Sequence, residues 1–152
     1  MAFSRSGTSS ITRMPRSADS TTSSSLAESV RFGAQECLIS AKELEKKFPS
    51  TTGNYILTFH ALELGLKAFL LKQGLSADDL RKRHGHNLVR LLEISQNHGL
   101  SLSTPDAKDL IAWINEWHDD KVKIRYDFTS TRELPWCDMI LPIVDEVIAA
   151  SK

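Results

Sequence analysis

A dense group of basic side chains lies near the middle of the chain. Within residues 81–90, six side chains are Arg, Lys or His: Arg81, Lys82, Arg83, His84, His86 and Arg90. Guanidinium groups bind phosphate through paired hydrogen bonds, and imidazoles add donors or exchange protons. The whole chain has no net attraction for phosphate, because 19 Lys and Arg balance 19 Asp and Glu. Any phosphate site must therefore be local.

Two residues inside this basic segment favour a ligand site. Gly85 lets the backbone turn or a ligand approach closely. Asn87 is suited to cap a helix, and the amides at or after it present a helix N-terminus, which attracts anions. Three interpretations stay open. The segment is a solvated basic loop, a catalytic site, or a phosphate-binding site formed by Arg81, Arg83, His84, His86 and Asn87.

Other chemistry has less support in the sequence. His84 and His86 are too close together to act as two metal ligands on one helix face, and no neighbouring cysteine or carboxylate cluster completes a tetrahedral set. We expect neither a metal nor a cofactor. Cys37 and Cys137 are far apart and form no CxxC motif, which favours reduced thiols in a cytoplasmic protein. No Gly-rich phosphate loop, GxSxG or HExxH motif occurs.

The composition divides the chain into a tail and one domain. Residues 1–25 contain 13 Ser or Thr, three Arg and one acid, too few apolar side chains to offset the entropy of ordering. We expect a disordered Ser/Thr-rich tail there, with a transit peptide as the alternative. Residues 26–152 suit a single helical domain. No uncharged apolar run reaches 18 residues, so no membrane helix is predicted.

Apolar spacing predicts helices over about 25–48, 54–73, 88–97, 103–120 and 135–150. Capping boxes at Ser25 and Ser76, Pro105 at a first helical position, and stops at Gly74 and Gly99 mark their ends. A short helical turn after Ser76 should be interrupted by Gly85. Residues 121–134 lack helical periodicity, and we expect an extended connection there. The fold predicted is all-α, an antiparallel four- to five-helix up-and-down bundle.

The helix over 54–73 is apolar on nearly every side, so other helices must surround it. Its polar residues His60, Glu63 and Lys67 fall on one narrow stripe. Glu63 and Lys67 also have the favourable i,i+4 order for an ion pair. Either this is a pair on the helix surface, or the stripe faces the basic segment and holds its side chains in place. Apolar side chains predicted to face inward elsewhere include Phe48, Trp113, Trp136 and Met139.

Two stretches, HALELGLKAFLLKQG and RHGHNLVRLL, resemble the HEPN domain superfamily. The matching positions are Ala61, Glu63, Leu66, Lys67, Ala68 and Leu70, followed by His86, Asn87, Leu88 and Leu91. Arg125 and Tyr126 resemble an arginine–tyrosine pair that many members carry before the final helix. The resemblance covers roughly residues 28–150. It implies a HEPN-like antiparallel bundle that forms a homodimer.

The resemblance also implies possible activities. Some HEPN branches are metal-independent endoribonucleases of toxin–antitoxin or phage-defence systems, with an Arg-x(4–6)-His motif that Arg81 and His86 fit. By this resemblance His86 would assist proton transfer at the RNA 2′-hydroxyl and Arg81 would stabilise the phosphate. Lys82 departs from the small polar residue usual after the arginine, and the motif lies earlier than in the nuclease branches. Other branches bind nucleotides or pair with a nucleotidyltransferase-type protein.

Three functions follow as hypotheses. The first is a binding module, without catalysis of its own, for a phosphate-bearing ligand (nucleotide or RNA) or a protein partner. The second is an endoribonuclease that uses Arg81 and His86. The third is a purely structural homodimerisation domain. In the first two, the supporting residues would be Glu63, Lys67, Arg125 and Tyr126. We expect the protein in the cytoplasm, with no membrane partner.

Overall fold

The computed structural model describes residues 23–119, 123 and 133–152 of the chain. These residues form α-helices and one π-helical segment, and no strand occurs among them, so the all-α prediction is confirmed. The predicted tail over 1–25 lies almost wholly outside the described residues. So do Arg125, Tyr126 and most of the connection expected over 121–134. No helix in the described part is long and apolar enough to cross a membrane.

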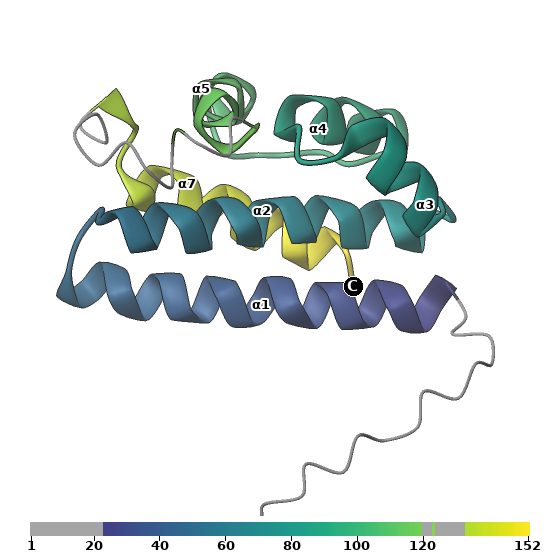
Figure 1. Cartoon of the computed structure of the whole chain (residues 1–152), viewed down its shortest axis with the longest axis horizontal. Coiled ribbons are helices and arrows are strands. Elements are labelled where there is room, and N and C mark those ends of the chain that lie inside the picture. Colours follow the sequence, from purple (N-terminus) through teal and green to yellow (C-terminus); the bar gives the residue numbers. More distant parts are fainter. Residues whose placement is uncertain (1–22, 120–122, 124–132) are drawn as a thin grey trace, which may run out of the picture.

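Three helices run side by side and form the base of the molecule (Figure 1). Helices α1 (Ser23–Lys47) and α2 (Thr52–Lys72) form an antiparallel hairpin, and α7 (Cys137–Ala150) packs against both. A Cβ atom on Gly65 of α2 would lie 3.0 Å from the Val147 side chain. The missing side chain therefore allows α2 and α7 to approach closely.

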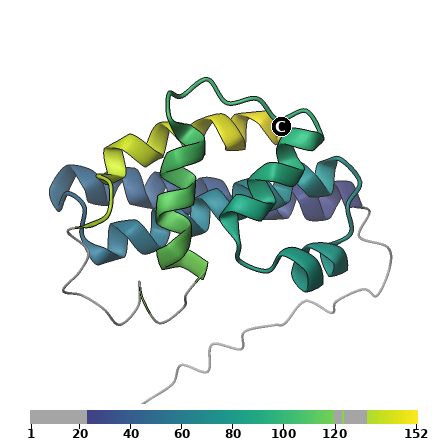
Figure 2. The same ribbon diagram turned by 90° about the horizontal axis from the view of Figure 1, so that it is seen from above.

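Two further helices lie across α2 on the side away from α1 (Figures 1 and 2). They are α4 (Leu88–Asn97) and α5 (Ala107–Asp119). Helix α2 is thus covered on several sides, as its apolar sequence predicts. Its fully buried side chains include Phe59, Leu62, Leu66 and Leu70. The finer prediction of a HEPN-like up-and-down bundle stays a prediction.

Local sequence chemistry determines the boundaries around the basic segment. Gly74 has φ +96° and ends α2, with the Leu75 N–H bonded to the Leu70 carbonyl. Helix α3 (Ala77–Asp79) follows, and the Ser76 hydroxyl accepts the Asp79 N–H at 3.1 Å, as the capping box predicts. The chain continues into the π-helical segment η1 (Leu80–His84) and turns at Gly85.

Two predicted helix starts are wrong. Helix α1 begins at Ser23, so Ser25 lies inside the helix rather than capping it. Helix α5 begins at Ala107, so Pro105 is not its first residue. Asp106, with a φ of +59°, interrupts helical geometry after Pro105, and the hydroxyls of Ser103 and Thr104 donate to the Glu146 carboxylate of α7 at 2.8 and 2.6 Å. These hydroxyls therefore hold the α4–α5 connection on α7 and cap no helix.

Several large apolar side chains predicted to face inward are exposed. Ile111, Ile114 and Trp117 already fill the buried face of α5, so the apolar stripe is wider than the contact that covers it. The exposed set comprises Phe48 (60%), Trp113 (47%), Trp136 (64%) and Met139 (48%).

The conformation of Gly85 gives a test of how the basic segment is placed. Its φ of +52° and ψ of −117° disfavour any side chain, although nothing lies within 4 Å of the Cβ position. Gly85→Ala should therefore lower the free energy of unfolding by about 1–3 kcal/mol through backbone strain alone. Urea unfolding would measure this change.

A matched control is Gly53→Ala in the first turn of α2. A Cβ there would lie 3.6 Å from Leu44, an ordinary contact, so alanine should be neutral or stabilising by up to about 1 kcal/mol. Equal stability of the two variants would contradict the strained turn at Gly85.

Candidate functional site

A buried carboxylate joins three segments of the chain. Glu63 of α2 has a side chain only 2% exposed, and its Oε1 lies 2.5 Å from Nζ of Lys67 on the next turn. Nδ1 of His86, in the turn between η1 and α4, lies 3.0 Å from both carboxylate oxygens. Nε2 of His118, in the last turn of α5, lies 2.5 Å from Oε2. We call these four side chains the Glu63 cluster.

The environment keeps Glu63 charged. Burial alone would raise the pKa of this carboxyl group, but hydrogen bonds from His118, Lys67 and His86 outweigh burial and hold the pKa well below its usual range. A charged carboxylate only accepts hydrogen bonds. Each contacting nitrogen must therefore carry a proton, on Nδ1 in His86 and on Nε2 in His118.

The two imidazole rings differ in exposure. The His118 side chain is 12% exposed and packs edge-on against Phe59, with ring centroids 6.1 Å apart. The His86 side chain is 46% exposed and meets His118 edge-on at 6.2 Å. Nε2 of His86 has no hydrogen-bond partner among the described residues. The cluster therefore presents one oriented imidazole to solvent.

The polar stripe on α2 faces the basic segment, which is the second of the two interpretations of its sequence. Glu63 faces the basic segment and holds His86, while Lys67 is 18% exposed and pairs with the same carboxylate. His60, the third member of the stripe, is exposed and makes no hydrogen bond to a described residue. Glu63 thus positions a side chain of the basic segment, and Lys67 contacts the carboxylate that does so.

Sequence reasoning missed His118. It lies 55 residues from Glu63, so no local spacing connects the two. One signal was available: His118 follows Ile111 and Ile114 by seven and four residues, which places a polar group on the buried stripe of α5. A polar side chain at such a position needs a buried partner.

The basic segment carries its own counter-charges. Arg81 and Lys82 pair with Asp78 at 2.9 and 2.7 Å, and Arg83 lies 3.8 Å from Asp79. The three cations remain 65–75% exposed. Exposed ion pairs of this kind contribute little free energy. A phosphate can therefore displace the aspartates, although their charges lower the local positive potential.

Side-chain oxygens accept two of the amides at the N-terminus of α4, where the sequence predicts an anion site. The Asn87 side chain accepts the Arg90 N–H at 2.9 Å, and the Leu88 N–H donates to the Asn115 side chain at 2.6 Å. Nδ2 of Asn87 also lies 3.4 Å from a carboxylate oxygen of Asp119. These contacts satisfy amides that a buried helix end cannot leave unpaired. Asn87 is thus a helix cap, as predicted, and its role as a phosphate ligand stays a prediction.

His84 also differs from the cation expected of it. Partial burial, together with the neighbouring charges of Arg90 and Arg83, lowers the pKa of His84. Its Nδ1 is buried and has no hydrogen-bond partner in the part of the chain that the structure describes. The lowered pKa disfavours a positive charge on His84.

An apolar pocket lies beside the Glu63 cluster. It has a volume of about 150 Å³ and opens between α1, α2 and the α3–η1 segment. Two cations line it, Lys67 and Arg81. The other lining side chains are Leu26, Val30, Leu64, Leu71, Ala77 and Leu80. Its composition suits a ligand with a flat apolar part and an anionic group.

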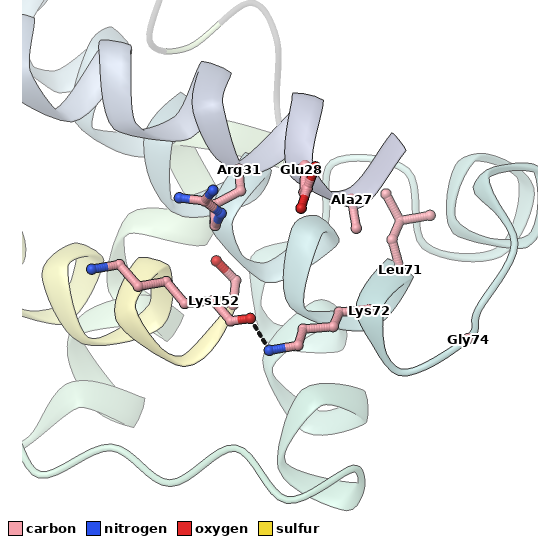
Figure 3. A pocket seen from close by; sticks show the side chains of 8 residues that line it. Ala27, Glu28, Arg31, Leu71, Lys72, Gly74 and Lys152 are labelled. Atoms are coloured by element: carbon pink, nitrogen blue, oxygen red, sulfur yellow. Dashed lines mark hydrogen bonds between the residues drawn. The ribbon is translucent and has the colours of Figure 1, made fainter. Parts of the chain in front are cut away.

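A second pocket, of about 310 Å³, lies where α1 passes the ends of α2 and α7 (Figure 3). Arg31, Glu28, Lys72 and Lys152 are among the side chains around it. Nζ of Lys72 donates to the main-chain oxygen of Lys152. None of the candidate catalytic, phosphate-binding or supporting residues predicted from the sequence lines this pocket.

The cysteines do not form a nucleophilic site. Both are free, and Cys137 is buried. Burial raises the pKa of the Cys137 thiol to about 12, so the reactive thiolate is not formed near neutral pH.

In comparisons with protein-family models, with curated proteins and with solved structures, nothing matched the chain. Function is therefore argued from the residues themselves.

Substitution of Glu63 tests the energetic role of the cluster. Glu63→Gln leaves Lys67 and two histidines around a neutral amide, so the free energy of unfolding should fall by about 2–4 kcal/mol. Chemical denaturation at neutral pH would measure the loss. Glu93→Gln removes an exposed carboxylate of α4 and should change stability by less than about 0.5 kcal/mol. A similar small effect of both variants would contradict a role for Glu63 in stability.

The pH dependence of that loss has a definite sign. The pKa of Glu63 in the folded protein lies below the unfolded value of about 4.3. Its contribution is therefore complete above about pH 5 and declines as the pH falls below about 4. The stability difference between wild type and Glu63→Gln should shrink over that acid range. A difference that is constant with pH would contradict the lowered pKa.

Proposed function

We propose that the protein binds a phosphate-bearing ligand, a nucleotide or RNA, on the surface formed by Arg81, the apolar pocket and His86. One observation carries this proposal. Arg81 and Lys67 line the same apolar pocket, and Lys67 shares the Glu63 carboxylate with His86. Cations, an apolar surface and an oriented imidazole thus occur together in an otherwise neutral protein.

The chemistry of each part fits such a ligand. A base or sugar can cover the apolar side chains of the pocket. The Arg81 guanidinium can leave its exposed pair with Asp78 for a phosphate, which accepts paired hydrogen bonds. Lys82 and Arg83 extend the cationic surface along η1, and π-helical turns frequently occur at functional sites.

The proposal includes a HEPN-like bundle and a homodimer in the cytoplasm. The motif residues of α2 support it, since Ala61, Glu63, Leu66, Ala68 and Leu70 are buried among the other helices. Exposed apolar side chains, among them Phe32, Trp113 and Trp136, are available for contact with a second copy or a protein partner such as a nucleotidyltransferase.

An endoribonuclease is the second candidate, and the contact between Glu63 and His86 favours it. A carboxylate that fixes one imidazole nitrogen leaves the other in a defined orientation for proton transfer. In this function Nε2 of His86 would exchange the proton with the RNA 2′-hydroxyl, and Arg81 would stabilise the charged phosphate.

Binding of a labelled single-stranded RNA in EDTA tests the proposal. Wild-type affinity should fall linearly on a log–log plot against salt, because phosphate contacts release counterions. Arg81→Ala should weaken binding about tenfold at low salt, corresponding to about 1.4 kcal/mol. Lys108→Ala, which removes one exposed positive charge from α5, is the matched control and should have little effect.

The same reactions separate the candidates. Cleavage that is lost in both Arg81→Ala and His86→Ala establishes the ribonuclease. Binding without cleavage establishes the module without catalysis. If neither RNA nor a nucleotide binds at low salt while a dimer survives dilution, phosphate binding is contradicted and a structural homodimerisation domain remains.

A further inference from the structure

The Glu63 cluster brings a carboxylate and two imidazoles together, and these are groups that can bind a metal ion. We propose that Glu63, His86 and His118 form a binding site for one transition-metal ion of the zinc type. Their three potential ligand atoms all lie within 4.8 Å of one another. They come from α2, from the turn before α4 and from the end of α5. This proposal goes beyond phosphate binding and does not rest on it.

The distances within the cluster suit an ion. Four-coordinate zinc has bonds of about 2.0–2.2 Å to nitrogen and oxygen, which place neighbouring ligand atoms roughly 3.3 Å apart. The carboxylate oxygen Oε2 of Glu63 lies 3.0 Å from Nδ1 of His86 and 2.5 Å from Nε2 of His118. An ion would therefore require these contacts to open by less than about 1 Å.

Hydrogen bonding and metal binding use the same atoms here. In the hydrogen-bonded state each contacting nitrogen carries the proton. To bind an ion, a neutral ring needs only to carry its proton on the other nitrogen, Nε2 in His86 and Nδ1 in His118. The lone pairs then point at the position that the protons occupied. The atoms that form hydrogen bonds around Glu63 are therefore also placed to coordinate one metal ion.

The donor set selects the class of ion. Two imidazole nitrogens and one carboxylate suit zinc and neighbouring transition metals, whereas calcium and magnesium prefer sites made of oxygen. Three protein ligands leave a fourth position open. His86 is 46% exposed, so solvent or a small anion can reach the site from its side.

Lys67 modulates the proposed site. It binds Oε1 of Glu63, the oxygen further from His118, and so fixes the carboxylate as an outer partner. Its positive charge also opposes that of the ion. Lys67→Met should therefore tighten metal binding by removing this repulsion. In the metal-free cluster, by contrast, Lys67→Met removes a stabilising contact with Glu63. The same substitution should therefore weaken the hydrogen-bonded cluster and strengthen metal binding.

Titration of the chelator-treated full chain tests the site without RNA. Zn²⁺ affinity would be measured by competition with a chromophoric chelator, and Co²⁺ binding by its visible absorption, which reports coordination geometry. We expect one ion per chain. His118→Ala and His86→Ala should each weaken binding by about 100-fold, and their folding would be checked by circular dichroism. His98→Ala, an exposed histidine on the far end of α4, is the control and should bind as wild type does.

The outcomes decide the proposal separately from RNA binding. One ion per chain, lost in the two site variants and retained in His98→Ala, supports it. Absence of zinc and cobalt binding at millimolar ion overturns it, as does binding that persists when His86 and His118 are both replaced by alanine. Neither result depends on whether the protein binds RNA, and RNA binding in EDTA does not depend on the ion.

Discussion

The charge of Glu63 is the constraint on which the rest of the site depends. Removal of a carboxylate from water costs several kcal/mol, and that cost must be offset by partners within hydrogen-bond distance. Here the partners are Lys67 on the same helix and two histidines from distant segments. The start of α4 and the end of α5 are therefore tied to the centre of α2.

The contact between Glu63 and His86 determines which groups of the basic segment face solvent. Gly85 and the cap at Asn87 bring the chain from η1 into α4 with His86 between them, above Glu63. Asn87 and Asn115 accept the Arg90 and Leu88 amides at the start of α4, so two of the groups at this helix end already have protein partners. Cations on η1 and one oriented imidazole then face solvent beside an apolar pocket.

Local chemistry made much of the fold predictable. The boundaries at Gly74, Ser76 and Asn87 each depend on residues within four positions, and all three occur as the sequence indicates. The burial of α2 follows from its composition. The Glu63–Lys67 pair follows from helical spacing.

The rest depends on contacts between distant residues. The Glu146 carboxylate accepts the hydroxyls of Ser103 and Thr104, which lie 43 and 42 residues away in the sequence. His118 reaches Glu63 across 55 residues. Spacing along one helix shows that such a polar group is buried, but it does not name the partner. The sequence therefore indicates His86 and the role of its neighbours, and only the packed helices show the second histidine.

The protonation pattern of the imidazole rings tests the central claim most directly. Long-range ¹H–¹⁵N correlation spectra of the metal-free protein at neutral pH distinguish the two nitrogens of each ring. We expect a protonated Nδ1 in His86 and a protonated Nε2 in His118, both altered in Glu63→Gln, with His98 unchanged by that substitution. A proton predominantly on Nε2 of His86, or rings that do not respond to Glu63→Gln, would contradict a carboxylate that holds both histidines.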